Sequence, residues 1–501
     1  MTHAPGENDD RAGAGEPAVS RAALGTLGGA PGDGARHRGL ALFLVSAAQF
    51  VLQLDFSIVN VALATIQREF GVAPADLQWI VTGYALPFGS LLLLGGRLGD
   101  MLGHRRLLTS GLVLFGLTSL GAGLAPSAGA LVAFRFLQGA SAALVAPMAL
   151  ATVTDLFEDG PARNRALGIF QGATAGGATA GILTQFVGWR AIFLVNPPVI
   201  VILVLAMARL LPGVAHSDNS NKPRLDITGS ALVTASVASL IYGLTQGQQR
   251  GFGQPVTLAA LTLAVLLAAA FAVAERRVAA PMVSFQVLAD RGRRAALVVQ
   301  LLVSSVISGY VYFIALYMQR VLGFSALQAG LALVPATATV MVTSTFLTRR
   351  LLARAGVRTV LAAGLALVGL GQLWLSRLAA PGSYPVHVLP GVLLTSLGMG
   401  LVFPTASIAV TAGMKPGERG LAGGLFVTAQ QVGLAIGLAV LATVAAARTR
   451  VASGAGPASS RLAQAAALAA GYRLSYLVAA IVVALTLALA LVLLRPRQAR
   501  G

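Results

Sequence analysis

One carboxylate stands alone in a long apolar run near the start of the chain. Asp55 is the only charged residue in the stretch FVLQLDFSIVNVALATI, residues 50–66. In a segment that crosses a membrane, an ionisable side chain is costly and commonly marks the path of a proton or a substrate. Burial favours the neutral form of a carboxyl group, whereas a nearby cation favours the charged form. Asp55 is therefore the strongest candidate for a proton-binding group.

Arg135, within the apolar stretch LVAFRFLQGASAA, is the candidate partner of Asp55. A rise of 1.5 Å per residue from the start of each run places both residues roughly 8–9 Å below the same edge of a ~30 Å hydrocarbon core. We predict that the two side chains pair or compete within one helix bundle. Two roles stay open for Asp55 at this point, proton coupling and purely structural pairing between helices.

A stripe of polar residues shares the predicted helix with Asp55. At about 100° per residue, Gln49, Gln53, Ser57 and Asn60 cluster on one side, and Asp55 points roughly the opposite way. The stripe predicts a wall of a substrate cavity. Asp55 is then expected to face a neighbouring helix.

Other polar and aromatic side chains inside apolar runs are candidates for substrate contacts, although each could instead bridge or pack between helices. These candidates are Gln138, Gln300, Tyr310, Gln430 and Gln431. The five His residues show no ligand-like spacing and the chain has no Cys, so we expect no metal and no cofactor. No loop gathers a nucleophile, a base and metal ligands, which argues against an enzyme.

Composition sets the class of protein that must position these residues. Of 501 residues, 56% are hydrophobic and 11% are charged, against about 25% charged in soluble domains. The net charge of +19 comes from small groups of Arg between apolar runs rather than one basic tract. The chain is therefore predicted to be an integral membrane protein, with lipid and not nucleic acid as its large partner.

Long apolar runs predict membrane-spanning helices, which need about 20 residues each. With the N-terminus inside, about 26 Lys and Arg fall on the inner side and about 9 on the outer side. This alternation favours fourteen spans in the cytoplasmic membrane with both termini cytoplasmic. The predicted spans are 40–63, 77–96, 107–126, 129–153, 164–186, 190–211, 227–246, 255–274, 295–318, 326–348, 357–378, 386–411, 421–445 and 473–494.

Two loops show a weak internal repeat. An offset of 253 residues aligns GGRLGDMLGHRRLL, residues 95–108, with TRRLLARAGVRTVL, residues 348–361. Transporters are often built from such repeats around a site near the bilayer midplane. We predict a disordered cytoplasmic tail at 1–38, a six-helix bundle at 39–212, two inserted transmembrane helices with linkers at 213–290, a second six-helix bundle at 291–496 and a cytoplasmic tail at 497–501.

The loop at 95–108 resembles the first cytoplasmic loop of the major facilitator superfamily. The stretches LDFSIVNVALATI and LVAFRFLQGASAA resemble its first-span and fourth-span motifs, so the chain is similar to the fourteen-span drug:proton antiporter branch, the EmrB- and QacA-like transporters. This resemblance implies the major facilitator fold, all-α. It also implies a conformational latch that holds the two bundles in one state. The latch residues would be Gly96, Gly99, Asp100, Gly103, Arg105 and Arg106.

Three features depart from the family pattern. The fifth span, GIFQGATAGGATAGILTQFVGWR, has no Pro where family antiporters usually carry a Gly-Pro signature. In the second loop Ala353 stands where Asp100 stands in the first, so the latch would be one-sided. His104 replaces a commonly basic residue and is expected to supply only partial charge.

The expected function is proton-driven efflux of drugs or a natural product by alternating access. Its partners would be a small amphipathic molecule, protons and the bilayer, and we expect a monomer. Two alternatives stay open: a facilitator or symporter for another small solute, and a membrane sensor that does not transport.

Overall fold

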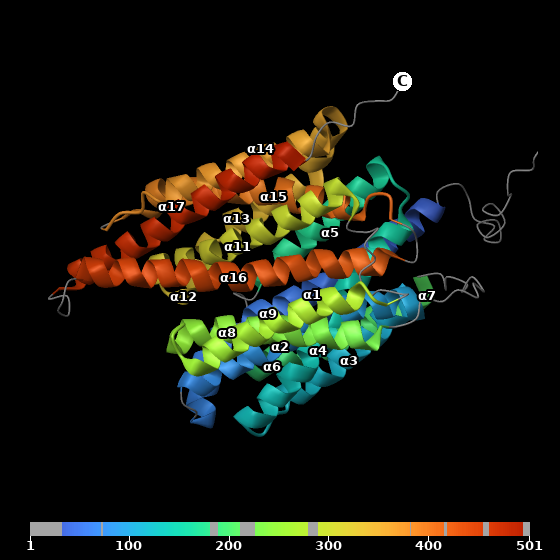
Figure 1. Ribbon diagram of the computed structural model, residues 1–501, viewed down its shortest axis with the longest axis horizontal. Helices are drawn as coiled ribbons and strands as arrows, with labels where there is room; N and C mark the ends of the chain where they lie inside the picture. Colours follow the sequence, from blue (N-terminus) through green and yellow to red (C-terminus); the bar gives the residue numbers. More distant parts are fainter. Residues whose placement is uncertain are drawn as a thin grey trace, which may run out of the picture.

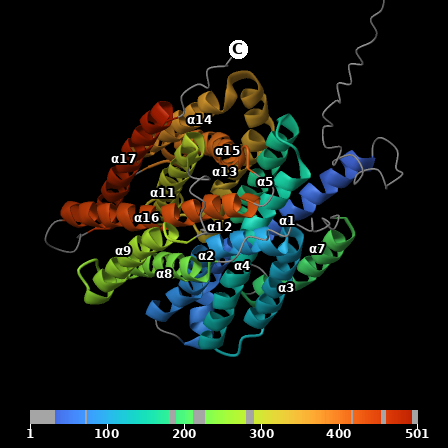
Figure 2. The same ribbon diagram turned by 45° about the vertical axis from the view of Figure 1, so that its right-hand side comes forward.

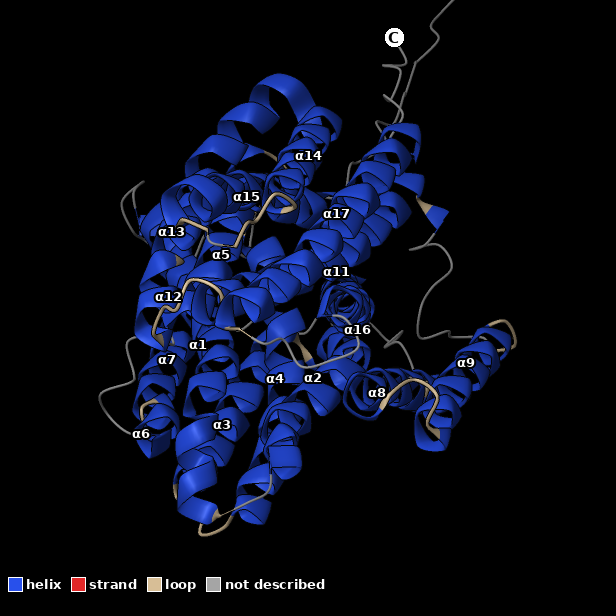
Figure 3. Ribbon diagram, turned by 90° about the vertical axis from the view of Figure 1, so that its left-hand side faces the viewer, coloured by secondary structure: helices blue, strands red, loops and turns tan. Residues whose placement is uncertain are grey.

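The computed structural model describes residues 33–71, 74–180, 189–210, 226–278, 289–380, 382–414, 418–453 and 460–493, and within these ranges the regular elements named below are helices (Figure 3). Most of the two predicted tails, the linker at 211–225 and residues 181–188 of the fifth span lie outside the described residues. The helices are α1 (Asp33–Phe70), α2 (Pro74–Leu102), α3 (His104–Gly123), α4 (Ala128–Leu156), α5 (Pro161–Ala180), α6 (Trp189–Leu194), α7 (Asn196–Leu210), α8 (Ile227–Arg250), α9 (Pro255–Glu275), α11 (Arg291–Arg320), α12 (Ala326–Ala332), α13 (Val334–Val342), the π-helical η2 (Thr343–Leu347), α14 (Thr348–Leu375), the π-helical η3 (Tyr384–Val388), α15 (Leu389–Thr411), α16 (Arg419–Ser453) and α17 (Arg461–Leu493).

Twelve helical stretches among the described residues are long and apolar enough to cross a membrane. One of them, Gln328–Leu375, has 48 residues and contains Gly356 at φ 73° and ψ 171°, which is not helical backbone. Two helices therefore meet end to end in that stretch. The 20-residue helix α5 is a further helix outside the twelve.

The helices lie in two groups that meet along α16, which packs against α11 and α17 of the second group and against α2 of the first. In Figure 1, α11, α14, α15 and α17 lie above α16, whereas α2, α3 and α4 lie below it, and Figure 2 shows the same grouping. One buried cluster is drawn mainly from α1, α2, α3, α4, α5 and α7. A second is drawn from α11, α14, α15, α16 and α17, with residues of α12 and α13. The second group thus surrounds an apolar core of its own, whereas the first cluster extends into α15 and α16.

Helix α8 lies along the seam between the two groups. It packs against both α2 and α16, and Tyr242 of α8 stacks on Trp79 of α2 with ring centroids 6.1 Å apart. Helix α9 packs on α8 and leaves Val265 and Leu266 exposed at 69% and 61%, as its outlying position in Figure 3 suggests. Apolar side chains exposed in this way suit contact with lipid.

Local sequence explains the two helix ends that position the site. The turn from α2 into α3 has Gly103 at φ 96°, in the left-handed region that side chains with a Cβ avoid. We call the end of the bundle that carries this turn the latch end, and the opposite end the far end.

The second break separates α6 from α7, where Asn196 is followed by Pro197 and Pro198. Proline has no N–H to continue a helix but fits its first turn, so a new helix starts at Asn196.

Candidate functional site

Asp55 lies at the centre of a buried polar network that joins α1, α4 and α7. Its Oδ2 accepts a hydrogen bond from Nη1 of Arg135 at 2.6 Å, and neither side chain is exposed. Its Oδ1 accepts hydrogen bonds from Nε2 of Gln138 and Nδ2 of Asn196, both at 2.9 Å. An ionised carboxylate only accepts, whereas a protonated one must donate from one oxygen. Three donors on two oxygens therefore fit the charged form of Asp55.

Besides its ion pair with Asp55, Arg135 is held in position by uncharged groups. Its Nε donates to the carbonyl oxygen of Ile80 at 3.2 Å, and Nη1 also donates to Oε1 of Gln138 at 2.8 Å. The guanidinium carbon lies 4.3 Å from the ring centroid of Tyr84. Removing one partner of a buried ion pair leaves an uncompensated charge. The state of the network therefore depends on the charge of Asp55.

Asn196 and Ser119 are site residues that the sequence did not reveal. Nδ2 of Asn196 donates to Asp55 and also to Oγ of Ser119 at 3.0 Å, and Ser119 in turn donates to the carbonyl oxygen of Phe193 at 2.9 Å. The one sequence feature that could have indicated Asn196 is the Asn-Pro-Pro triplet inside an apolar run. The triplet starts α7 and places the amide of Asn196 in the interior. Helices α3 and α7 are thereby tied to the carboxylate.

The structure describes the side chains of only part of the polar stripe of α1. Gln49 is buried and Gln53 is half-buried, and the side chains of Ser57 and Asn60 lie outside the described residues. Gln138, expected in a cavity wall, is fully buried and hydrogen-bonded to both members of the ion pair. The reason is spacing, because residue 138 lies one helical turn from Arg135 on the same face.

The candidates in the second half of the chain lie apart from Asp55. Gln300 is fully buried and donates to Oγ of Ser304 at 3.3 Å, and Tyr310 is 4% exposed within the second apolar core. Gln430 and Gln431 of α16 are half-buried. A methyl group on Gly89 of α2 would lie 3.8 Å from Cβ of Gln431, so that amide lies at the contact between α2 and α16.

At the latch end, Asp100 joins α2 to the start of α16. Its Oδ1 accepts from the backbone N–H of Gly420 at 2.8 Å, and its Oδ2 accepts from that of Leu421 at 2.9 Å. These amides belong to the first turn of a helix, where N–H groups lack partners within the helix and the dipole favours an anion. The carboxylate thus holds the two groups of helices together.

Glycines allow the close approach that this contact needs. A Cβ on Gly96 would lie 2.5 Å from the carbonyl oxygen of Gly420, and one on Gly423 would lie 2.7 Å from that of Pro147. A Cβ on Gly99 would overlap the sulfur of Met148 at 1.9 Å. The predicted latch glycines therefore lie where α2, α4 and α16 touch, or at the turn of Gly103.

The basic residues of the predicted latch lie differently from what the family pattern implied. Nη2 of Arg105 donates to the carbonyl oxygen of Ala208 at 2.8 Å, and Ala208 lies in the C-terminal part of α7. Arg106 is exposed. The partner of Asp100 is instead His104, whose Nε2 lies 3.0 Å from Oδ1. His104 was expected to supply only partial charge, but in the structure it contacts the Asp100 carboxylate directly.

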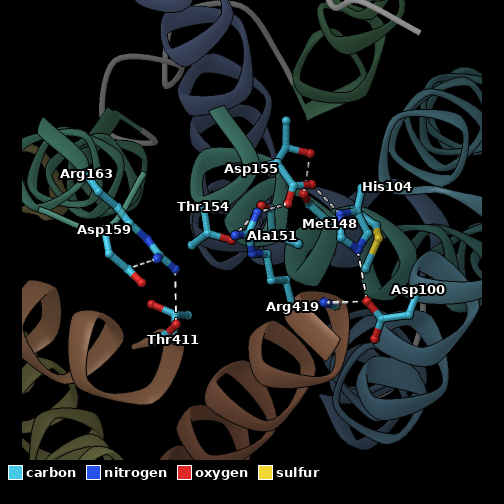
Figure 4. A network of polar contacts seen from close by, with 12 residues as sticks. Asp100, His104, Met148, Ala151, Thr154, Asp155, Asp159, Arg163, Thr411 and Arg419 are labelled. Atoms are coloured by element: carbon cyan, nitrogen blue, oxygen red, sulfur yellow. Dashed lines mark hydrogen bonds and ion pairs between the residues drawn. The ribbon is translucent and has the colours of Figure 1, made fainter. Parts of the chain in front are cut away.

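His104, Asp155 and Arg419 complete the network at the latch end (Figure 4). Nδ1 of His104 lies 2.5 Å from Oδ2 of Asp155, and Oδ1 of Asp155 accepts from Nη1 of Arg419 at 2.7 Å. Arg419 is the first residue of α16, so Asp155 also joins the two groups. We use the name latch network for Asp100, His104, Asp155, Arg419 and the amides of Gly420 and Leu421.

A second contact at the latch end joins α5 to the helices of the second half. Arg163 pairs with Asp159 and donates from Nη2 to the carbonyl oxygen of Thr411 at 3.1 Å, beside the latch network in Figure 4. A Cβ on Gly172 would lie 2.8 Å from Oγ of Ser344 in η2. These contacts close the latch end on both sides of the seam.

At the far end, Glu69 joins α1 to α6. It accepts hydrogen bonds from Nε1 of Trp189 at 2.6 Å and from Nη1 of Arg190, and Nη2 of Arg190 donates to the carbonyl oxygen of Ala125 at 3.1 Å. The hydrogen bond from Trp189, followed by that from Arg190, holds the pKa of Glu69 below its usual value. The Trp-Arg pair therefore fastens helices within the first half.

An apolar crevice of about 690 Å³ opens between α1 and α5 near the latch end. Its lining includes Leu42, Phe43, Phe50, Phe157 and Ile169, and none of the predicted site residues. Across the part of the chain that the structure describes, no three His, Cys, Asp or Glu gather as metal ligands.

Known proteins similar to this chain are transporters. The family model described as Major Facilitator Superfamily matches residues 45–438. The cephamycin export protein CmcT of Amycolatopsis lactamdurans is 38% identical over 82% of this chain and 85% of its own length. The puromycin resistance protein pur8 of Streptomyces alboniger is 37% identical over 82% of this chain and 83% of its own length.

Solved structures with the same fold are more distant in sequence. The human organic anion transporter MFSD10 has a TM-score of 0.65 at 18% identity, covering 90% of this chain and 99% of that one. The proton:xylose symporter XylE has a TM-score of 0.60 at 14% identity, covering 91% of this chain and 95% of that one. At these identities the likeness shows the fold alone.

Proposed function

The chain belongs to the major facilitator superfamily, and on that premise we propose that it exports a drug or a natural product across the cytoplasmic membrane by alternating access. The observation that carries this proposal is similarity over four fifths of the chain to proteins named for cephamycin export and puromycin resistance. The likeness gives the class of cargo, a small organic molecule.

Fourteen spans form part of the proposal. The stretch Gln328–Leu375 supplies two spans that meet at Gly356, and α5 supplies one more. Added to the other eleven stretches, these give fourteen. The N-terminus, the latch end and the C-terminus then lie in the cytoplasm, in agreement with the excess of Arg in the loops on that side. The two groups of helices are the two six-helix bundles, with α8 and α9 inserted between them.

The closed contacts at the latch end support assigning this arrangement to the outward-facing state. Asp100 and Asp155 bind the start of α16, and Arg163 binds the end of α15, all at the latch end. Opening toward the cytoplasm requires these contacts to break together. The exporter then loads its cargo from the cytoplasmic side when the latch is open, and releases it outside when the latch is closed.

Asp55 couples this cycle to protons. With the carboxylate ionised, Arg135 has its counter-ion and the amides of Gln138 and Asn196 have their acceptor. A proton on Asp55 removes the negative charge and turns one oxygen into a donor, so one of the three partners must move. Because these partners lie on α4 and α7, the change in protonation becomes a change in how α1, α4 and α7 pack. Gradient-driven antiport follows if cargo binding and protonation favour opposite arrangements.

Everted membrane vesicles with an imposed pH gradient test the export function. Cationic and neutral antibiotics are offered to vesicles that contain the protein and to matched vesicles without it. We expect at least one compound to accumulate inside, and an uncoupler to abolish the accumulation. Uptake that ignores the gradient would identify a facilitator, and movement of cargo in the same direction as protons would identify a symporter. Either result contradicts proton-driven export.

A further inference from the structure

The latch network contains a side chain that binds a proton, His104. Both of its ring nitrogens lie against carboxylates, Nε2 at 3.0 Å from Asp100 and Nδ1 at 2.5 Å from Asp155. A neutral imidazole has one N–H donor and one acceptor, whereas the imidazolium has two donors. The geometry can thus be satisfied by the cation, provided that both carboxylates are ionised.

Both carboxylates already accept hydrogen bonds from other donors. Asp100 accepts from the amides of Gly420 and Leu421, and Asp155 accepts from the guanidinium of Arg419. These donors favour the acceptor-only, ionised form of each carboxylate. With both anions in place, His104 must donate through both nitrogens, and deprotonation would turn a lone pair toward one of the carboxylates.

The charged surroundings of His104 come from three other helices. Asp100 belongs to α2, Asp155 to α4 and Arg419 to α16, and the side chain of His104 itself is 11% exposed. On its own helix α3, Arg105 follows and directs its guanidinium to Ala208. Two anions thus contact the imidazole, and one cation binds the other oxygen of Asp155. If the imidazole were uncharged, less positive charge would offset the negative charges of Asp100 and Asp155.

The geometry points to a second proton-binding site, at His104, which holds a proton when the two groups of helices are closed at the latch end and loses it when they part. The reason is that Asp100 and Asp155, which favour the imidazolium, are themselves held by the start of α16. Coupling between two equilibria is reciprocal. If closure favours protonation of His104, acid on that side of the membrane must favour closure. The inference rests on the proposed alternating access, but not on the identity of the cargo or on Asp55.

The absence of Cys from the chain allows a direct measurement of closure. Spin labels on Leu102→Cys and Ala355→Cys, both exposed and one in each repeated loop, report the distance between the loops. The measurement uses purified protein in nanodiscs from about pH 5.5 to about pH 9.5, without drug. An Asp55→Asn background removes the other proposed proton site.

We expect the ratio of closed to open molecules to fall about tenfold as pH rises, within the range typical of coupled sites. His104→Arg keeps a permanent charge, so the latch should stay closed at every pH. In His104→Gln the open fraction should not change with pH, and should equal that of the protein with His104 at high pH. His387→Gln, a change at a half-buried His of η3, is the matched control and should keep the pH dependence.

Two results would overturn the assignment. If His104→Arg kept the pH dependence of the wild type, the titrating group would lie elsewhere. If Asp100→Ala opened the latch but His104→Gln left it closed, His104 would have no part in closure while alternating access would stand. A latch that opened in none of the variants would contradict the inference and the proposed alternating access together.

Discussion

The two halves of the molecule share a scaffold and differ in their chemistry. The offset of 253 residues places Gly103 over Gly356, and both have positive φ, at 96° and 73°. It also places Arg105 over Arg358, and each donates to a carbonyl oxygen near the end of the last helix of its half, at Ala208 and at Leu491, both at 2.8 Å. The repeat is thus visible in backbone and contacts as well as in sequence.

The same offset places Asp55 over Ser308 and Asp100 over Ala353. Ser308 donates to its own helix at Ser305, and the interior of the second half is held by neutral bonds such as that from Gln372 to Thr395 at 3.1 Å. The comparison teaches that the two halves share the turn and the Arg contact but not the carboxylates. The Asp55–Arg135 ion pair and Asp100 occur in the first half, and we propose that they serve motion.

The largest effect is expected at Asp55. Asp55→Asn removes the charge that compensates Arg135 and the group that binds the proton, so gradient-driven efflux should fall at least about tenfold. Ser308→Ala, at the equivalent place in the second half, should leave efflux within about twofold of the wild type. Initial rates in everted vesicles measure both. Equal losses in the two variants would refute the asymmetry.

Asp100→Ala should have the next largest effect. It removes two hydrogen bonds to a charged acceptor at the start of α16, and should destabilise the closed state by about 3 kcal/mol. Ala353→Ser, in the second loop, should change little. The loop-to-loop distance between labels on residues 102 and 355 measures the closed fraction. An unchanged closed fraction in Asp100→Ala would show that the latch is held by other contacts.

Gly96→Ala tests close approach. The added methyl would lie 2.5 Å from a backbone oxygen of Gly420, and such overpacking costs about 1–3 kcal/mol. The closed state should weaken while the fold survives. Gly39→Ala is the control, because nothing lies within 4 Å of its Cβ position. Equal closure in both variants would contradict the tight contact between α2 and α16.

Arg105→Ala and Arg358→Ala should have the smallest effects, and equal ones. Each removes one hydrogen bond to a carbonyl oxygen, with a cost of about 1 kcal/mol. Thermal unfolding in detergent should shift by a similar small amount for the two variants. A much larger loss of efflux in Arg105→Ala would show that its role goes beyond the repeated scaffold.

Apolar runs and depth counting predict an all-helical membrane protein and the meeting of Asp55 with Arg135, because both depend on local order along single helices. The family follows from the resemblance of the loop at 95–108 and of two span motifs. The sequence also points Asp55 away from Gln49 and toward neighbouring helices, where the structure places it between α4 and α7. It does not predict Asn196, which approaches Asp55 across 141 residues. Contacts of this kind depend on how helices pack, and periodicity within one helix contains no such information.

The latch shows the same limit. The family pattern marks the loop whose carboxylate, Asp100, contacts the start of α16, but it implies that Arg105 and Arg106 are the basic partners. His104 takes that place because it begins α3 one helical turn after Asp100, with Asp155 of α4 on its other side. Arg419 was not singled out, because nothing in its own segment distinguishes it from other loop arginines.

Counter-movement of protons and drug in proteoliposomes tests the central claim most directly. A drug gradient is imposed without a pH gradient, and proton flux is followed with a pH-sensitive dye. The account predicts that protons move against the drug with the wild-type protein, and that Asp55→Asn moves drug down its gradient without protons. Protons that move with the drug, or proton flux that persists in Asp55→Asn, would contradict it.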